Sequence, residues 1–99
     1  MPINTSVKGD ELTITVEGRF DFSAHQEFRD AYEEADTGVN KYVIDMSRAT
    51  YLDSSALGML LLLRDHAGGE SANVRISRCN SDVKKILTIS NFEQLFTID

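Results

Sequence analysis

The chain has 99 residues, of which 41% are hydrophobic and 26% charged, and its formal net charge is -6. These proportions are typical of a globular protein, so we expect residues 1–99 to form a single domain. The negative charge repels phosphate backbones, which argues against nucleic acid as a partner. The longest apolar run, residues 56–63, is too short to span a bilayer, and the first residues resemble no secretory signal. We therefore expect a cytoplasmic protein without membrane insertion.

Cysteine and histidine are too scarce for redox or metal chemistry. Cys79 is the single cysteine, so no internal disulfide can form. One cysteine and two histidines are too few ligands for a structural zinc site. We expect neither a metal site nor a cofactor.

The N-terminal part of the chain predicts a hairpin. Residues 12–17 alternate apolar and polar side chains with a period of two, which predicts a strand with one buried face. Residues 3–7 are expected to pair with this strand across a turn at residues 8–11.

A helix is predicted after the hairpin, from about Ala24 to Asp36. Ser23 stands three residues before Gln26, which is the spacing of a capping box, and apolar side chains follow at helical spacing. Residues 37–40 are expected to end this helix.

A strand and an apolar helix come next. Residues 42–46 are mostly apolar, which is typical of a central strand covered on both faces. Asp53 and Ser54 precede a helix so apolar around its circumference that much of it is expected to be buried, and Gly68 and Gly69 end it.

The C-terminal part predicts a strand at residues 73–77, a third helix and a last strand at residues 95–98. Ser81 is the expected cap of this helix. Its expected inward side chains are Val83, Ile86, Leu87 and Ile89. With short right-handed crossovers, these elements predict an α/β domain with one mixed sheet flanked by helices, without internal repeats or linkers.

The segment most suggestive of function is residues 51–58, which place Ser54 and Ser55 at the entry to a helix. Free backbone N–H groups and the positive end of the helix dipole gather there. On local pattern alone the simplest interpretation is a structural cap, because Asp and Ser are preferred at that position.

Two motifs add a resemblance to a known family. Residues 52–58, Leu-Asp-Ser-Ser-Ala-Leu-Gly, resemble the Asp-Ser-Ser/Thr-Gly-Leu-Gly motif of the bacterial STAS-domain anti-sigma factor antagonists. Residues 18–21, Gly-Arg-Phe-Asp, are similar to the family's Gly-x-Leu/Phe-Asp before the first helix, and the element order follows the family over essentially the whole chain. The resemblance implies a STAS-like mixed sheet of about five strands flanked by about three to four helices.

The resemblance also implies a function and a set of site residues. In such proteins the Ser after the Asp is phosphorylated by a partner anti-sigma factor that is also a kinase, which carries over to Ser54, with its neighbour Ser55 as the alternative. The unphosphorylated form sequesters the anti-sigma factor or related kinase and so controls transcription indirectly. A PP2C-type serine phosphatase, in some systems within a response regulator, restores binding. The implied partner-binding residues are Asp21, Asp53, Ser54, Ser55 and Ala56.

The sequence departs from the family motif at Ala56, where most members carry Gly. Ala favours a helix by about 1 kcal/mol but adds a methyl group where a partner would approach closely. The departure leaves the identity of the partner open, as the sequence does for the sigma factor and the phosphatase. We expect a monomer or a weak dimer.

The expected effect of phosphorylation follows from electrostatics. A phosphate adds roughly two negative charges and three acceptor oxygens at Ser54. The free N–H groups of a helix N-terminus favour an anion, so the fold should tolerate it. Together with Asp21 and Asp53, the phosphate would concentrate negative charge in a desolvated interface, and loss of the partner is the expected result.

Two other functions compete with this hypothesis. An enzyme would use Ser54 as a nucleophile, but the chain has no Gly-x-Ser-x-Gly elbow and no convincing base, so we expect no enzymatic activity. A STAS adaptor subunit of a transport or lipid-trafficking complex, without phosphorylation, is the alternative. An adaptor need not keep a phosphorylatable Ser, whereas this chain retains both Ser54 and the preceding Asp53, and this favours the phosphorylation switch.

Overall fold

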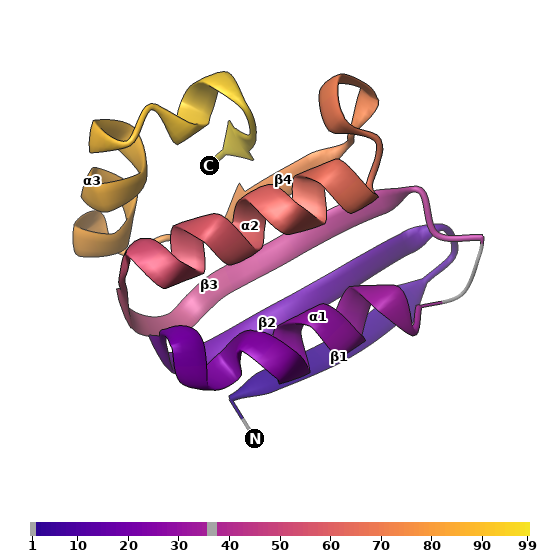
Figure 1. Cartoon of the computed structure of the whole chain (residues 1–99), viewed down its shortest axis with the longest axis horizontal. Coiled ribbons are helices and arrows are strands. Elements are labelled where there is room, and N and C mark those ends of the chain that lie inside the picture. Colours follow the sequence, from indigo (N-terminus) through magenta and orange to yellow (C-terminus); the bar gives the residue numbers. More distant parts are fainter. Residues whose placement is uncertain (1, 36–37) are drawn as a thin grey trace.

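The computed structural model describes residues 2–35 and 38–99. Its strands and helices follow the predicted order, shown in Figure 1. They are β1 (Ile3–Lys8), β2 (Glu11–Phe20), α1 (His25–Glu33), β3 (Lys41–Leu52), α2 (Ser54–His66), β4 (Val74–Ser77), α3 (Ser81–Ile89) and β5 (Thr97–Ile98). Short 3-10 turns lie at Phe22–Ala24, Gly69–Ser71 and Phe92–Gln94.

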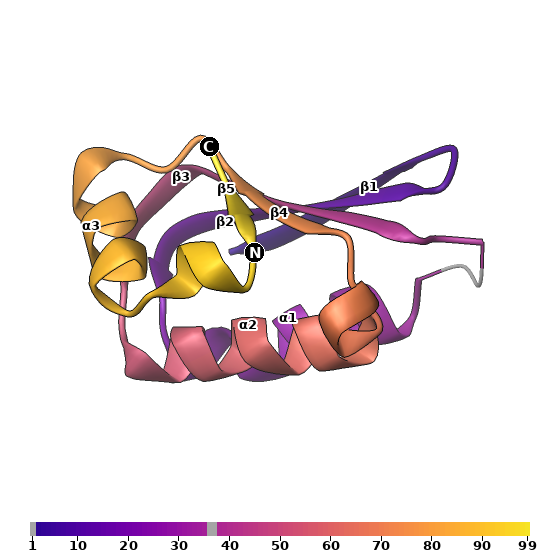
Figure 2. The ribbon, with the colours of Figure 1, turned by 90° about the horizontal axis from the view of Figure 1, so that it is seen from above.

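The strands form one mixed sheet in the order β1-β2-β3-β4-β5. β1 pairs antiparallel with β2, and every other neighbouring pair is parallel. The three parallel crossovers all step in the same direction across the sheet, so right-handed connections place their helices on the same side. Figure 2 shows α1 and α2 side by side below the sheet, with α3 at one end of it.

This one-sided arrangement contradicts the expectation that residues 42–46 form a strand covered on both faces. In β3, Tyr42, Ile44 and Met46 are buried, whereas Val43 and Asp45 are only partly covered. Successive side chains of a strand point to opposite faces, so one face packs under the helices and the other remains open among the described residues.

β3 extends beyond the predicted residues 42–46. The prediction was too short because two irregularities in the pairing interrupt the alternation of buried and exposed side chains. The pairing with β2 shifts by one residue between Thr15 and Glu17 and again between Gly18 and Arg19. Gly18 has a φ of 73°, a left-handed conformation that costs glycine little. The buried positions of β3 therefore change their spacing beyond Met46, and simple alternation fails to predict its second half.

The start of the first helix also differs from the prediction. Ser23 lies inside a 3-10 turn and does not cap α1; Asp21 caps that turn instead. The α-helix begins at His25 without a side-chain cap. The predicted helix end at Asp36 and the following Thr37 lie outside the described residues.

Three details of the other helices are corrected as well. Burial of α2 covers one face, and Leu61 and Leu62 stay exposed on the other. The cap of α3 is Asn80, whose side chain accepts a hydrogen bond from the Val83 N–H at 2.8 Å, so Ser81 is the first helical residue. Ile89 is 71% exposed, so it does not belong to the inward stripe of α3.

The last residues of β2 and β3 anchor the region that carries the two sequence motifs. Phe20 and Leu52 are paired across the sheet and are buried, with 0% and 1% exposure. The Phe20 ring packs on Phe28 of α1 with 5.0 Å between ring centroids. Buried side chains therefore hold both strand ends, and the residues that follow leave the sheet at defined positions.

Candidate functional site

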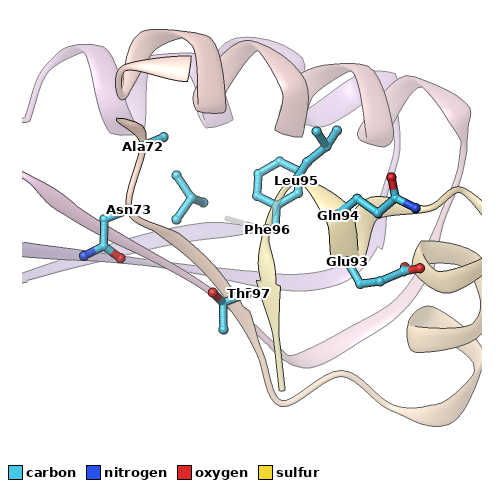
Figure 3. A pocket seen from close by; sticks show the side chains of 8 residues that line it. Ala72, Asn73, Glu93, Gln94, Leu95, Phe96 and Thr97 are labelled. Carbon is cyan, nitrogen blue, oxygen red and sulfur yellow. The ribbon is translucent and has the colours of Figure 1, made fainter. Parts of the chain in front are cut away.

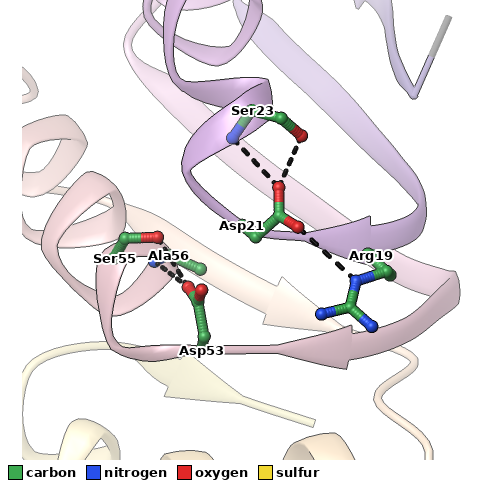
Figure 4. Close-up of polar contacts among 6 residues, drawn as sticks. All are labelled: Arg19, Asp21, Ser23, Asp53, Ser55 and Ala56. Carbon is green, nitrogen blue, oxygen red and sulfur yellow. Dashed lines mark hydrogen bonds and ion pairs between the residues drawn. The ribbon is translucent and has the colours of Figure 1, made fainter.

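The two sequence motifs meet at the carboxyl ends of β2 and β3. Because Phe20 pairs with Leu52, the next residues, Asp21 and Asp53, leave neighbouring strands at the same edge (Figure 4). The Asp53 N–H donates to the Phe20 carbonyl at 3.4 Å, which joins the two turns through the backbone. We call residues 20–24 the Asp21 turn and residues 52–56 the Asp53 turn.

Asp53 caps helix α2. Its backbone is extended, and its Oδ1 accepts the Ala56 N–H at 3.1 Å and the Ser55 hydroxyl at 2.6 Å. An Asp at this position satisfies an N–H group that has no partner within the helix. The structural interpretation of Asp53 is therefore confirmed, and it does not exclude a further role for the hydroxyls beside it.

The two serines of the motif have different surroundings. Ser54, the first residue of α2, is exposed, and its hydroxyl has no hydrogen bond to any described residue. Ser55 is partly buried, and its hydroxyl donates to the Asp53 carboxylate. The Ser54 hydroxyl can be modified without breaking a hydrogen bond between described residues, whereas modification of Ser55 would remove part of the cap.

The Asp21 turn is built in a similar way. Asp21 Oδ1 accepts both the backbone N–H of Ser23, at 3.0 Å, and the Ser23 hydroxyl. Arg19 contacts the other oxygen, with 3.5 Å between Nε and Oδ2, and its guanidinium lies 4.7 Å from the centre of the Tyr51 ring on β3. Asp21 was predicted as a site residue, whereas Ser23 was predicted only as a helix cap and no role was predicted for Arg19 or Tyr51. The pattern Asp-x-Ser-Ala, present in both turns, is the signal that would have indicated Ser23.

Both carboxylates are stabilised in their ionised form. The Ser23 hydroxyl and N–H hold the pKa of Asp21 below its ordinary value, with a smaller contribution from Arg19. The Ser55 hydroxyl does most to lower the pKa of Asp53, and the nearby charge of Asp21 opposes this shift. At neutral pH the surface beside Ser54 therefore carries two carboxylate charges.

Ala56, a predicted partner-binding residue, does not present its side chain at the surface. Its side chain is fully buried, with 0% exposure, so the methyl group faces the core and cannot meet a partner. Phe22, which sequence analysis did not select, is exposed instead at 68% and stacks on His25 with 5.1 Å between ring centroids. The predicted set thus loses the side chain of Ala56, while Asp21, Asp53, Ser54 and Ser55 lie at one edge.

A hollow elsewhere on the molecule has a mostly uncharged lining. It has a volume of about 490 Å³ and lies between the start of β4 and residues 93–97 (Figure 3). Glu93 is the single titratable side chain in its lining, beside the amides of Asn73 and Gln94. In residues 2–35 and 38–99, no group of three or more His, Cys, Asp or Glu side chains is arranged to hold a metal ion.

Among the helices of the described ranges, none is both long enough and apolar enough to cross a bilayer.

Comparisons with known proteins agree with the fold. The putative anti-sigma factor antagonist from Thermotoga maritima superposes with a TM-score of 0.85 at 15% identity, covering 97% of this chain and 84% of that one. The unphosphorylated Bacillus anti-sigma factor antagonist SpoIIAA gives a TM-score of 0.72 at 14% identity, with 98% and 86% covered. A sulfate transporter family protein from Wolinella succinogenes gives 0.79 at 14% identity, with 95% and 80% covered. The predicted mixed sheet and helices of a STAS-like fold are confirmed.

Sequence comparison identifies the family. The chain is 64% identical over 93 residues to a STAS-domain containing protein of Pseudomonas aeruginosa (strain UCBPP-PA14), a match covering 94% of this chain and 92% of that protein. Residues 3–97 match the family described as Mlab, STAS domain. The chain therefore belongs to the STAS domain family.

Proposed function

We propose that this chain is an anti-sigma factor antagonist of the bacterial cytoplasm that acts by binding, without catalysis, and is switched by phosphorylation of Ser54. The observation that carries the proposal is the contrast between the two serines. Ser54 is exposed with an unengaged hydroxyl, whereas the Ser55 hydroxyl is held by Asp53. The unphosphorylated form would bind an anti-sigma factor or related kinase, and a PP2C-type phosphatase would reset the switch.

The charges around Ser54 support this mechanism. Asp21 and Asp53 are ionised at neutral pH, and Arg19 is the one cation in ion-pair contact with either of them among the described residues. A phosphate on Ser54 would add roughly two negative charges to this surface. A partner that fits the unphosphorylated surface would then meet like-charge repulsion in a desolvated interface, which costs several kcal/mol.

Phosphate incorporation tests the site directly. Wild type, Ser54→Ala and Ser55→Ala are incubated with ATP in host lysate, and each is weighed by intact mass spectrometry. We expect one phosphate on wild type and on Ser55→Ala, and none on Ser54→Ala. An unmodified wild type, in a lysate that phosphorylates another STAS antagonist added as a positive control, would contradict the proposal.

Partner binding tests the consequence. Purified unphosphorylated and phosphorylated protein are immobilised at equal density, and the captured anti-sigma factor or kinase is identified and quantified. We expect capture by the unphosphorylated form, loss on phosphorylation, and recovery after treatment with a PP2C-type phosphatase. Equal capture by both forms would contradict the switch even if Ser54 carries phosphate.

A STAS adaptor subunit of a transport or lipid-trafficking complex is the second candidate. The family description names Mlab, and a sulfate transporter family protein is among the structural neighbours. An adaptor would remain unphosphorylated and would co-purify with a transporter in both wild type and Ser54→Ala. Co-purification of this kind, together with absent phosphate, would favour the adaptor.

A further inference from the structure

The outer edge of β1 presents backbone groups that pair with no strand of residues 2–35 and 38–99. β1 is the first strand in the sheet order, and its one neighbour in the described structure is β2. The Glu17 N–H donates to the Pro2 carbonyl at 2.7 Å, which marks that pair as hydrogen-bonded. Hydrogen-bonded pairs alternate along an antiparallel ladder, so Asn4, Ser6 and Lys8 face β2. The N–H and C=O groups of Ile3, Thr5 and Val7 therefore point outward.

A groove lies along this edge, between β1 and helix α1. Its volume is about 240 Å³, and its lining comprises Ile3, Thr5, Glu27, Asp30, Ala31 and Glu34. Ile3 is buried at 8% exposure, which shows that this face of β1 points toward the helix. An edge strand with a parallel groove beside a helix is the arrangement that accepts an added strand from an extended peptide.

The groove has a strongly negative wall. Glu27, Asp30 and Glu34 all come from α1 or its end, and Glu27 and Asp30 are partly buried. Of the described cations, none forms an ion pair with any of the three; the ion pair of α1 joins Arg29 to Glu33. The Asp30 carboxylate accepts a hydrogen bond from the neutral Gln26 side chain at 2.8 Å, so it too keeps its charge without a described cation beside it. An occupant with positive side chains would therefore neutralise three carboxylates that form no ion pair within the described residues.

We propose that the β1 edge binds an extended, basic segment of a partner protein by strand addition. The backbone of the segment pairs with the outward groups of residues 3–7. Side chains alternate along a strand, so lysine or arginine at every second position would face Glu27, Asp30 and Glu34. No lining residue belongs to the Asp21 or Asp53 turn, so this surface is separate from the Ser54 site and goes beyond the proposed function.

Charge argues against a second copy of this chain as the occupant. Pairing of two β1 edges would bring together two acidic grooves on molecules that each carry a net charge of -6. Lys8 is the one basic residue of β1, and its backbone faces β2. A basic segment from a different protein avoids this repulsion.

The test uses an eight-residue synthetic peptide of alternating lysine and valine, titrated into the isotope-labelled protein at low salt. We expect amide shifts confined to β1 and α1, and slower hydrogen exchange of the outward Thr5 and Val7 amides. Thr5→Pro removes an outward donor without removing a bond to β2, a placement that edge strands tolerate, and should weaken binding about tenfold. Its melting temperature and amide spectrum show whether it remains folded.

Charge variants supply a second, independent arm. Glu27→Lys should lower the affinity for the peptide about fivefold. Glu70→Lys makes the same charge change on an exposed turn and should leave the affinity unchanged. Equal weakening by both variants, or no binding at millimolar peptide, overturns the proposal. Dimerisation of the wild type that Thr5→Pro abolishes, measured by sedimentation, would assign the edge to a second copy instead. Phosphate incorporation at Ser54 should be unaffected by Thr5→Pro and by Glu27→Lys. A failure of the strand-addition proposal can therefore be told apart from a failure of the phosphorylation proposal.

Discussion

The Asp21 turn and the Asp53 turn share one pattern of residues, and the main chemical difference between them is at the third position. Each follows a parallel strand and reads apolar-Asp-x-Ser-Ala; in each, the Asp accepts the Ser hydroxyl two residues later. The final Ala is buried in both, at 1% and 0% exposure. The variable position is exposed in both and is Phe22 in one turn and Ser54 in the other. Capping therefore explains the shared Asp and Ser, and the exposed third position is the one that can carry a modifiable hydroxyl.

The helices that follow also differ. Asp21 caps a three-residue 3-10 turn through the N–H of Ser23, whereas Asp53 caps a 13-residue α-helix through the N–H of Ala56. Helix α2 begins directly after Asp53, and its start gathers free N–H groups and the positive end of the helix dipole. After Asp21, the 3-10 turn of residues 22–24 comes between the Asp and the start of α1 at His25. The Asp53 turn is thus better suited to hold an added phosphate.

The largest expected effect comes from moving the hydroxyl between the turns. In a Ser54→Ala background, Phe22→Ser places a hydroxyl at the equivalent exposed position of the Asp21 turn. We expect intact mass to show no phosphate, because the 3-10 turn lacks the α-helical N-terminus. Phosphate on the double variant, absent from Ser54→Ala alone, would show that the five-residue pattern is sufficient and would remove the distinction.

Removing the capping Asp from each turn should lower the free energy of unfolding by different amounts. Asp53→Ala removes the acceptor for the Ala56 N–H and should lower the free energy of unfolding by about 1 kcal/mol. Asp21 caps only the short 3-10 turn, so Asp21→Ala should lower the free energy of unfolding by less. Urea denaturation measures both, and Asp53→Asn, which keeps an acceptor oxygen, is the matched control. An equal loss for the two alanine variants would contradict the different roles of the helices.

Restoring the family's usual Gly tests the buried methyl group. Ala56→Gly should lower the free energy of unfolding by about 1 kcal/mol through helix propensity and lost packing. Partner binding should not change, because the methyl group is buried. Ala24→Gly, at the end of the 3-10 turn, serves as the comparison and should cost less. Tighter partner binding by Ala56→Gly would show that the methyl group does affect the interface.

The smallest expected effect is on the two carboxyl pKa values. Ser55→Ala should raise the pKa of Asp53, and Ser23→Ala should raise that of Asp21, since each loses its main hydrogen bond. A carboxyl whose folded pKa is lowered stabilises the fold above its unfolded pKa of about 4, and this contribution is lost as the pH falls through the folded pKa. NMR titration of the side-chain carboxyl carbons measures both shifts. Unchanged values would mean that the hydroxyls do not stabilise the charges.

Local pattern was a good guide to the order of the elements and to the motif. Period-two alternation predicted β2, and helical spacing predicted the buried side of α1, because these signals depend on neighbours along the chain. Alternation failed for the second half of β3, where two register shifts break the period. It also failed to show that α1 and α2 cover the same face of the sheet, which depends on the direction of the crossovers.

The sequence by itself determined that Asp53 and Ser54 begin a helix and that the chain resembles the STAS antagonists. Only the tertiary structure decided which side chains lie together. The two register shifts in β3 bring Leu52 opposite Phe20, and so place Asp21 beside Asp53. Packing against the core buried Ala56 and left Ser54 exposed. Neither result follows from local spacing, because both depend on contacts between residues far apart in the chain.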